Sequence, residues 1–129
     1  MPAGRSLIHV FVADDSAPIR RRVNALLVAH GMFIAGEAGR PQECIDAILA
    51  SRPDVVVLDV QLEGGSGLQV LKTVRSTDPA VAFVVFSNSA GPAYRRRYLA
   101  EGAASFLDKS AEFNQLAHAV RSACGARFQ

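Results

Sequence analysis

The sequence contains no apolar run that approaches the roughly 18 consecutive residues needed for a membrane-spanning helix. Its first six residues form a short polar stretch, without the apolar segment of a secretory signal peptide. Only two cysteines occur, Cys44 and Cys124, and their spacing matches neither a metal motif nor a disulfide framework. These absences give no indication of membrane association, and we expect a cytoplasmic location.

Charge of one sign does not dominate either, because 12 Asp and Glu residues nearly balance 14 Lys and Arg residues. The net charge of +2 is too small to indicate direct nucleic-acid binding as the main activity. The chain has 129 residues, half of them hydrophobic, which is room for one globular core. We find no repeat, low-complexity segment or linker. We therefore expect a single domain over residues 6–126, with no room for an appended DNA-binding domain.

Short β-rich runs alternate with helical periods along the chain. The run Val55–Leu58 is unbroken and apolar, which is typical of a strand covered on both faces. Ser16, Pro41 and Pro92 carry the signals of helix starts. We also expect Ser110 to cap the last helix. The predicted strands cover residues 7–13, 32–37, 54–59, 81–86 and 104–107.

Strict alternation of five strands and five helices indicates the fold class. A strand that returns to the same sheet through a helix runs parallel to its predecessor. We therefore predict an α/β fold, a doubly wound five-stranded parallel sheet flanked by five helices. The glycine-rich stretch Gly64–Gly67 precedes a helix but matches neither the dinucleotide-binding nor the Walker pattern, so we expect a flexible turn there.

Polar side chains stand where the predicted strands end. Asp14 and Asp15 follow the first strand, Asp59 ends the third, Ser87 follows the fourth, and Lys109 comes just after the fifth. The carboxyl ends of parallel strands meet at one edge of the sheet, where ligands bind in such folds. Three carboxylates, a hydroxyl and an ammonium group are therefore expected to converge.

This combination of groups suits a cation and a phosphoryl group. Three neighbouring carboxylates repel one another and resist ionising together without a cation. Mg²⁺ prefers oxygen ligands, and a carboxylate beside it can act as a nucleophile toward phosphorus. A lysine can then neutralise the transferring oxygens.

These residues together resemble the signature of response-regulator receiver domains of two-component signalling. The resemblance rests on Asp14, Asp15, Asp59, Ser87 and Lys109, and it covers roughly residues 6–126. It implies a flavodoxin-like fold of the receiver type. It also implies a phosphoacceptor of a phosphorelay rather than an enzyme, with at most self-phosphorylation from small donors and self-dephosphorylation.

The resemblance implies a role for each site residue. Asp59 would be the phosphoacceptor. Asp15 would bind Mg²⁺, or Mn²⁺ in its place, directly, whereas Asp14 would act through a metal-bound water. The backbone carbonyl of Gln61 would complete the protein ligands. Lys109 would pair with Asp59 before phosphorylation and with the phosphoryl oxygens afterwards.

The resemblance also implies a switch and two kinds of protein partner. Ser87 would bond a phosphoryl oxygen, and Phe106 would rotate into the space that is vacated. A downstream protein, or a second copy, would bind the face around Tyr94–Leu99 and Ala104–Lys109. The phosphodonor would be a histidine kinase or a histidine phosphotransfer protein. Docking to it is one interpretation of Arg20–Arg22, and a solvated helix face is the simpler one.

The sequence departs from the family pattern at three positions, and two other functions stay open. Glu63 and Ser110 replace prolines that the family usually has, and Asn88 replaces a small residue. A cis Lys109–Ser110 bond would cost about 3–4 kcal/mol, so we expect it to be trans. One alternative is an interaction module that works without phosphorylation. The other is a Mg²⁺-dependent aspartyl phosphatase, which Gln61 disfavours because such enzymes usually have a second aspartate there.

Overall fold

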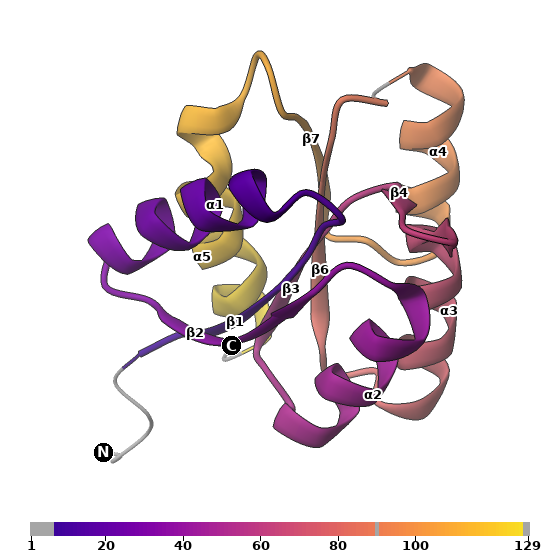
Figure 1. Cartoon of the computed structure of the whole chain (residues 1–129), viewed down its shortest axis with the longest axis horizontal. Helices are drawn as coiled ribbons and strands as arrows, with labels where there is room; N and C mark the ends of the chain where they lie inside the picture. Colours follow the sequence, from indigo (N-terminus) through magenta and orange to yellow (C-terminus); the bar gives the residue numbers. More distant parts are fainter. Residues whose placement is uncertain (1–6, 90, 128–129) are drawn as a thin grey trace.

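The computed structural model describes residues 7–89 and 91–127, and its centre is a five-stranded parallel sheet with the strand order β2–β1–β3–β6–β7 (Figure 1). This order and the alternation with helices confirm the predicted fold class. The sheet strands are β1 (His9–Ala13), β2 (Phe33–Ala38), β3 (Val55–Leu58), β6 (Ala82–Ser87) and β7 (Ser105–Asp108). The helices are α1 (Ala17–Ala29), α2 (Pro41–Ser51), α3 (Gly67–Thr77), α4 (Pro92–Ala100) and α5 (Leu116–Arg127).

Helices cover both faces of the sheet. Helices α1 and α5 lie on one face, and α2, α3 and α4 lie on the other (Figure 1). Successive residues of β3 point to opposite faces, so Val55 and Val57 join one apolar cluster, and Val56 and Leu58 join the other. All four side chains are buried, which confirms the prediction for this run. Among the described residues, none of the helices combines the length and the hydropathy of a membrane span.

Three of the predicted helix starts are found where expected. The Ser16 side chain accepts a hydrogen bond from the Ile19 amide at 3.3 Å and caps α1. Gly31 follows that helix with φ of +81°, a backbone conformation that favours glycine. Pro41 and Pro92 begin α2 and α4.

The prediction of a flexible turn over Gly64–Gly67 was wrong. Two short strands, β4 (Gln61–Leu62) and β5 (Gly65–Ser66), form an antiparallel pair there. Gly64 has φ of +85° and makes the turn between them. Strands of two residues are too short to show a periodic pattern, so they could not be predicted from the sequence.

The prediction that Ser110 caps the last helix was also wrong. A 3₁₀ turn at Phe113–Gln115 comes first, and α5 begins at Leu116. Asp108 organises the intervening loop, because its carboxylate accepts hydrogen bonds from the amides of Ser110 at 2.8 Å and Ala111 at 3.0 Å. This side-chain turn uses the amides with which a helix would have begun, and so delays the helix.

The sheet register places the polar strand ends together. Ala13 is paired with Leu58, and Leu58 with Val85, so that β1, β3 and β6 end side by side. Ser87 is paired with Asp108 at the end of β7. The loops that leave these four strands therefore start from one edge.

Candidate functional site

An acidic cluster stands at the carboxyl edge of the sheet. Asp14 and Asp15 follow β1, and Asp59 follows β3. One carboxylate oxygen from each of the three lies within 4.8 Å of the others. Asp14 and Asp59 are 3% and 7% exposed, whereas Asp15 is exposed to solvent. The structure thus brings together the three carboxylates that the sequence placed at strand ends.

Lys109, in the loop after β7, offsets part of the negative charge of this cluster. Its Nζ lies 2.6 Å from Asp14 Oδ2 and donates a hydrogen bond of 2.9 Å to Asp59 Oδ2. The Lys109 amide donates to the Ser87 carbonyl at 3.1 Å, which ties the lysine to the end of β6. Burial alone would lower the pKa of Lys109, but the hydrogen bonds and charges of Asp14 and Asp59 outweigh burial and raise it. The Lys109 side chain therefore stays protonated at neutral pH.

The environment of Asp14 raises the pKa of its carboxyl group above the ordinary value. Burial raises the pKa of Asp14 more than the hydrogen bonds from Lys109 and from the Ser16 amide lower it, and the negative charge of Asp59 raises it further. The Ser16 amide donates to Asp14 Oδ1 at 2.9 Å. An additional cation beside Asp14 would offset the cost of keeping this carboxylate ionised.

A small cavity opens onto the cluster. It has a volume of about 310 Å³, and its wall includes Asp15, Asp59, Gln61, Ser87 and Lys109. The Gln61 amide donates to Asp59 Oδ1 at 3.4 Å, so the chain after β3 curves around the carboxylate. The Ser87 hydroxyl oxygen, which is buried, accepts from the Ser89 amide at 3.0 Å. The cavity is therefore bordered by the Asp59 carboxylate, the Ser87 hydroxyl and the Lys109 ammonium group.

Phe106 lies away from this cavity, in the apolar cluster under α4. Its side chain is 1% exposed, and its ring meets Tyr98 edge-on with centroids 6.0 Å apart. The Arg95 guanidinium also lies over the Phe106 ring, 5.5 Å from its centroid. The structure therefore shows Phe106 in an inward position, packed against α4.

The three departures from the family pattern all make contacts in the structure. The Ser110 hydroxyl donates to Asn88 Oδ1 at 3.1 Å, which joins the loops after β6 and β7. Glu63 forms an ion pair of 2.7 Å with Arg40. No peptide bond in the described residues is cis, so the Lys109–Ser110 bond is trans as expected.

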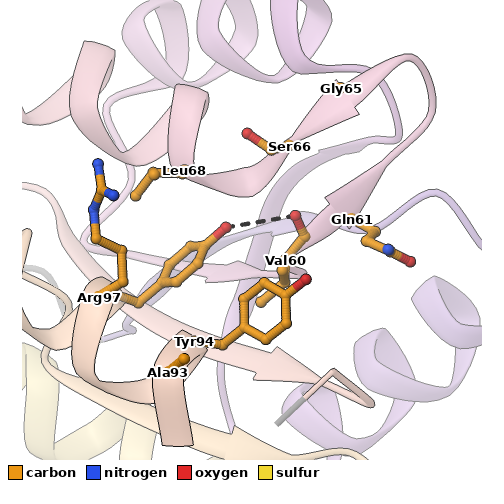
Figure 2. Close-up of a pocket in the computed structure, with 9 residues that line it drawn as sticks. Val60, Gln61, Gly65, Ser66, Leu68, Ala93, Tyr94 and Arg97 are labelled. Carbon is orange, nitrogen blue, oxygen red and sulfur yellow. Dashed lines mark hydrogen bonds between the residues drawn. The ribbon is translucent and has the colours of Figure 1, made fainter. Parts of the chain in front are cut away.

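A larger cavity of about 520 Å³ lies beside the site, between α4 and the β4–β5 pair (Figure 2). Tyr94, Tyr98 and Arg97 approach it from α4, and Val60 and Gln61 line it from the chain just after Asp59. The Tyr98 hydroxyl donates to the Val60 carbonyl at 3.5 Å. None of the three clustered carboxylates lines this cavity.

The position of Arg20 could not be predicted from the sequence. Arg20 belongs to the run Arg20–Arg22, for which the sequence allows a solvated helix face or a docking face. In the structure, Arg20 Nη1 instead donates to the Asp14 carbonyl at 2.6 Å. The one signal available was its place in the first turn of a helix that follows the acidic pair.

Comparison with known proteins finds transcriptional regulators among the relatives of this chain. A protein 29% identical over 116 residues is the uncharacterized transcriptional regulatory protein YvfU of Bacillus subtilis, with 89% of this chain and 58% of that protein aligned. The DNA-binding transcriptional activator DevR/DosR of Mycobacterium tuberculosis is 30% identical, with 94% of this chain and 56% of that protein aligned. The chain thus spans a little over half the length of these two relatives.

Solved structures and a family model give the same assignment. The signal receiver domain of the putative response regulator NarL from Mycobacterium tuberculosis superposes with a TM-score of 0.87 and 30% identity, covering 94% of this chain and 98% of that one. The sequence model of the response regulator receiver domain matches residues 10–121. The chain therefore belongs to the response regulator receiver domain family, whose members are phosphoacceptors of two-component systems.

Proposed function

We propose that this chain accepts a phosphoryl group on Asp59 from a histidine kinase or a histidine phosphotransfer protein. The observation that carries the proposal is the position of the Asp59 carboxylate. It lies at the carboxyl end of the central strand, 2.9 Å from the Lys109 ammonium and within 4.8 Å of two further carboxylates. Residues 6–126 would act as one receiver unit, and the cytoplasm would be its location.

The donor set fits Mg²⁺, with Mn²⁺ as an alternative. Asp14, Asp15 and Asp59 offer clustered carboxylate oxygens, and the Gln61 carbonyl would add a fourth protein oxygen. Burial already disfavours the charged form of Asp14, a cost that a divalent cation would offset. When bound, Mg²⁺ would neutralise charge on the transferring phosphoryl oxygens.

The transfer itself needs one nucleophile and one fixed cation from the protein. A carboxylate oxygen of Asp59 forms a bond to phosphorus while the bond from phosphorus to the donor imidazole nitrogen breaks, and the imidazole leaves with that electron pair. The Lys109 ammonium, now on Asp59 Oδ2, would shift its hydrogen bond to a phosphoryl oxygen. The Ser87 hydroxyl, which lines the same cavity, would donate a hydrogen bond to another phosphoryl oxygen.

The consequence for partners follows from Ser87 and Phe106. Drawing the loop after β6 toward the phosphoryl group would open space beneath α4, and Phe106 would turn into it. The face around Tyr94–Leu99 and Ala104–Lys109 would then change its affinity for a downstream protein or a second copy. We propose protein contacts rather than direct nucleic-acid contacts for this receiver unit.

Intact-mass measurement after incubation with Mg²⁺ and acetyl phosphate tests the proposal. We expect wild type to gain one phosphoryl group and Asp59→Asn to gain none. Asp54→Asn is the matched control, because Asp54 is also buried, at 3% exposure, but lies at the opposite end of β3. This control should be phosphorylated as wild type is.

Other outcomes would point to the alternative functions. If the wild type gains no mass and calorimetry detects no Mg²⁺ binding, the chain is an interaction module that works without phosphorylation. Sustained turnover of an external phosphoester, lost in Asp59→Asn, would instead show a phosphatase.

A further inference from the structure

The Arg20 side chain contacts the backbone of the loop that carries Asp14 and Asp15. Its Nη1 donates to the Asp14 carbonyl at 2.6 Å, and its Nε donates to Glu37 Oε1 at 2.6 Å. The side chain is 20% exposed, which is well below the exposure of a free surface arginine. One planar guanidinium therefore spans α1, the end of β2 and the loop after β1.

The carbonyl that Arg20 holds belongs to the peptide unit that joins the two acidic residues. A trans peptide unit is planar, so fixing the Asp14 carbonyl also fixes the direction of the Asp15 amide and the start of residue 15. On the other side, the Asp14 amide donates to the Ala38 carbonyl at 3.0 Å. The backbone of Asp14 is thus held from both its amide and its carbonyl.

Glu37 anchors the guanidinium. Its second carboxylate oxygen accepts from Asn24 Nδ2 at 2.9 Å, so both oxygens are engaged by α1 side chains. The packing around this arrangement is close at Gly39. A Cβ placed on Gly39 would lie 3.1 Å from Asp15 Cα and 3.2 Å from Arg20 Nη1. The glycine therefore lets the guanidinium and the acidic loop approach the end of β2 together.

We infer that Arg20 is a positioning residue for the divalent-cation site, that it acts through the peptide between Asp14 and Asp15, and that Glu37 holds it in place. This inference rests on the proposed function, because it concerns the affinity of the same acidic cluster for Mg²⁺.

The direction in which the Mg²⁺ affinity changes when Arg20 is removed distinguishes a positioning role from a purely electrostatic one. Arg20 is a cation, so if it acted only through its charge, removing it would tighten the binding of Mg²⁺. If it acts by orienting the carboxylates, removing it weakens binding. Loss of one hydrogen bond of ordinary strength corresponds to about a three- to tenfold change in the dissociation constant.

The experiment is calorimetric titration of the metal-free protein with MgCl₂, combined with urea unfolding of the same samples without metal. We expect Arg20→Gln to weaken Mg²⁺ binding about three- to tenfold, and Glu37→Gln to weaken it less. Arg20→Lys keeps the charge but not the fork that spans Asp14 and Glu37, so it should also bind more weakly than wild type. Arg21→Gln, the same change at the exposed neighbouring position, should bind at least as tightly as wild type.

The opposite results would overturn the inference. Arg20→Gln that binds Mg²⁺ as tightly as wild type, or more tightly, would show that Arg20 does not position the site, even if the variant unfolds at lower urea. If Arg20→Gln does not fold, Arg20→Lys decides in the same way, because it keeps the positive charge and removes only the fork that spans Asp14 and Glu37. Wild type that binds no Mg²⁺ would overturn the proposed function and this inference together. Wild type that binds Mg²⁺ and is phosphorylated, with Arg20→Gln unchanged, would overturn the inference alone.

Discussion

Lys109→Met should destabilise the metal-free protein more than any other single change in the acidic cluster. The Lys109 ammonium lies 2.6 Å from Asp14 Oδ2 and 2.9 Å from Asp59 Oδ2. The side chains of these three residues are only 10%, 5% and 9% exposed. Methionine keeps the length and the apolar stem of the lysine but leaves two buried carboxylates facing each other without a cation.

The size of the effect follows from the burial. Removing one partner of a buried ion pair typically costs about 3–5 kcal/mol, because the remaining charge is left uncompensated. A domain of this size unfolds with a free energy of about 5–15 kcal/mol, so the loss is a large fraction of the total. We expect Lys109→Met to lower the free energy of unfolding at neutral pH by about 3 kcal/mol.

The loss in the free energy of unfolding that Lys109→Met causes should become smaller as the pH falls. Burial raises the pKa of Asp14 in the folded protein, and Lys109 lowers it, so removing Lys109 moves this pKa further upward. The folded variant then binds a proton at a higher pH than the unfolded chain, in which aspartate titrates near about 3.9. Protonation therefore favours the folded state as pH falls through this window, and the variant approaches wild type.

Urea unfolding followed by far-ultraviolet circular dichroism measures the effect, at neutral and mildly acidic pH, with and without Mg²⁺. Lys72→Met is the matched control, because Lys72 is the chain's other lysine and is exposed on α3. Added Mg²⁺ should restore much of the lost stability, since it binds only the folded cluster. Adding Asp14→Asn to Lys109→Met should recover part of the loss. A loss below about 1 kcal/mol at neutral pH, or one that is independent of pH, would refute the reasoning.

Three further predictions concern the surroundings of the site. Gly67→Ala would place a Cβ against the Asp59 carbonyl oxygen, well inside van der Waals contact, so we expect a loss in the free energy of unfolding of about 3 kcal/mol or more and slower phosphorylation. Gly91→Ala is its control in the same urea assay and should be near neutral, because a Cβ there would meet nothing within 4 Å. Tyr98→Phe removes a buried hydroxyl, which should lower the free energy of unfolding by about 0.5–1.5 kcal/mol, and an unchanged urea midpoint would contradict the contact. Burial raises the pKa of the Cys44 thiol to about 12, so iodoacetamide should modify Cys44 in urea but not in the native protein at neutral pH. Mass spectrometry maps the modified residue, and labelling of Cys44 in the native protein would contradict the prediction.

The site residues that stand at the ends of strands could be predicted from the sequence. The apolar run Val55–Leu58 indicated a central strand, and the direction of a parallel sheet then placed Asp59 at the ligand-binding edge. The same reasoning brought Asp14 and Lys109 to that edge, where the structure has them 2.6 Å apart. This part was predictable because it depends on strand order and alternation, which hydrophobic periodicity reports directly.

The features that could not be predicted depend on local hydrogen bonds rather than on periodicity. Ser110 has the composition of a helix cap, but Asp108 competes for the same amides and the helix starts later. Arg20 and Arg21 are neighbouring residues of the same type. They differ in burial only because they lie at different angles around the axis of α1, which leaves Arg20 half-buried and Arg21 exposed. Such distinctions require the angle at which a helix sits on the sheet, which a single sequence does not contain.

Asp54 and Asp59 show how strongly position within the sheet decides the role of a residue. Both are aspartates that flank β3, and both are buried, at 3% and 7% exposure. Asp54 stands at the amino end, where its carboxylate accepts from the His9 amide at 2.8 Å and helps to hold β1 beside β3. Asp59 stands at the carboxyl end, where the loops diverge, and its carboxylate faces a cavity and an ammonium group. Burial and residue type are therefore the same at both ends of the strand, and the direction of the strand is what makes one aspartate structural and the other the expected nucleophile.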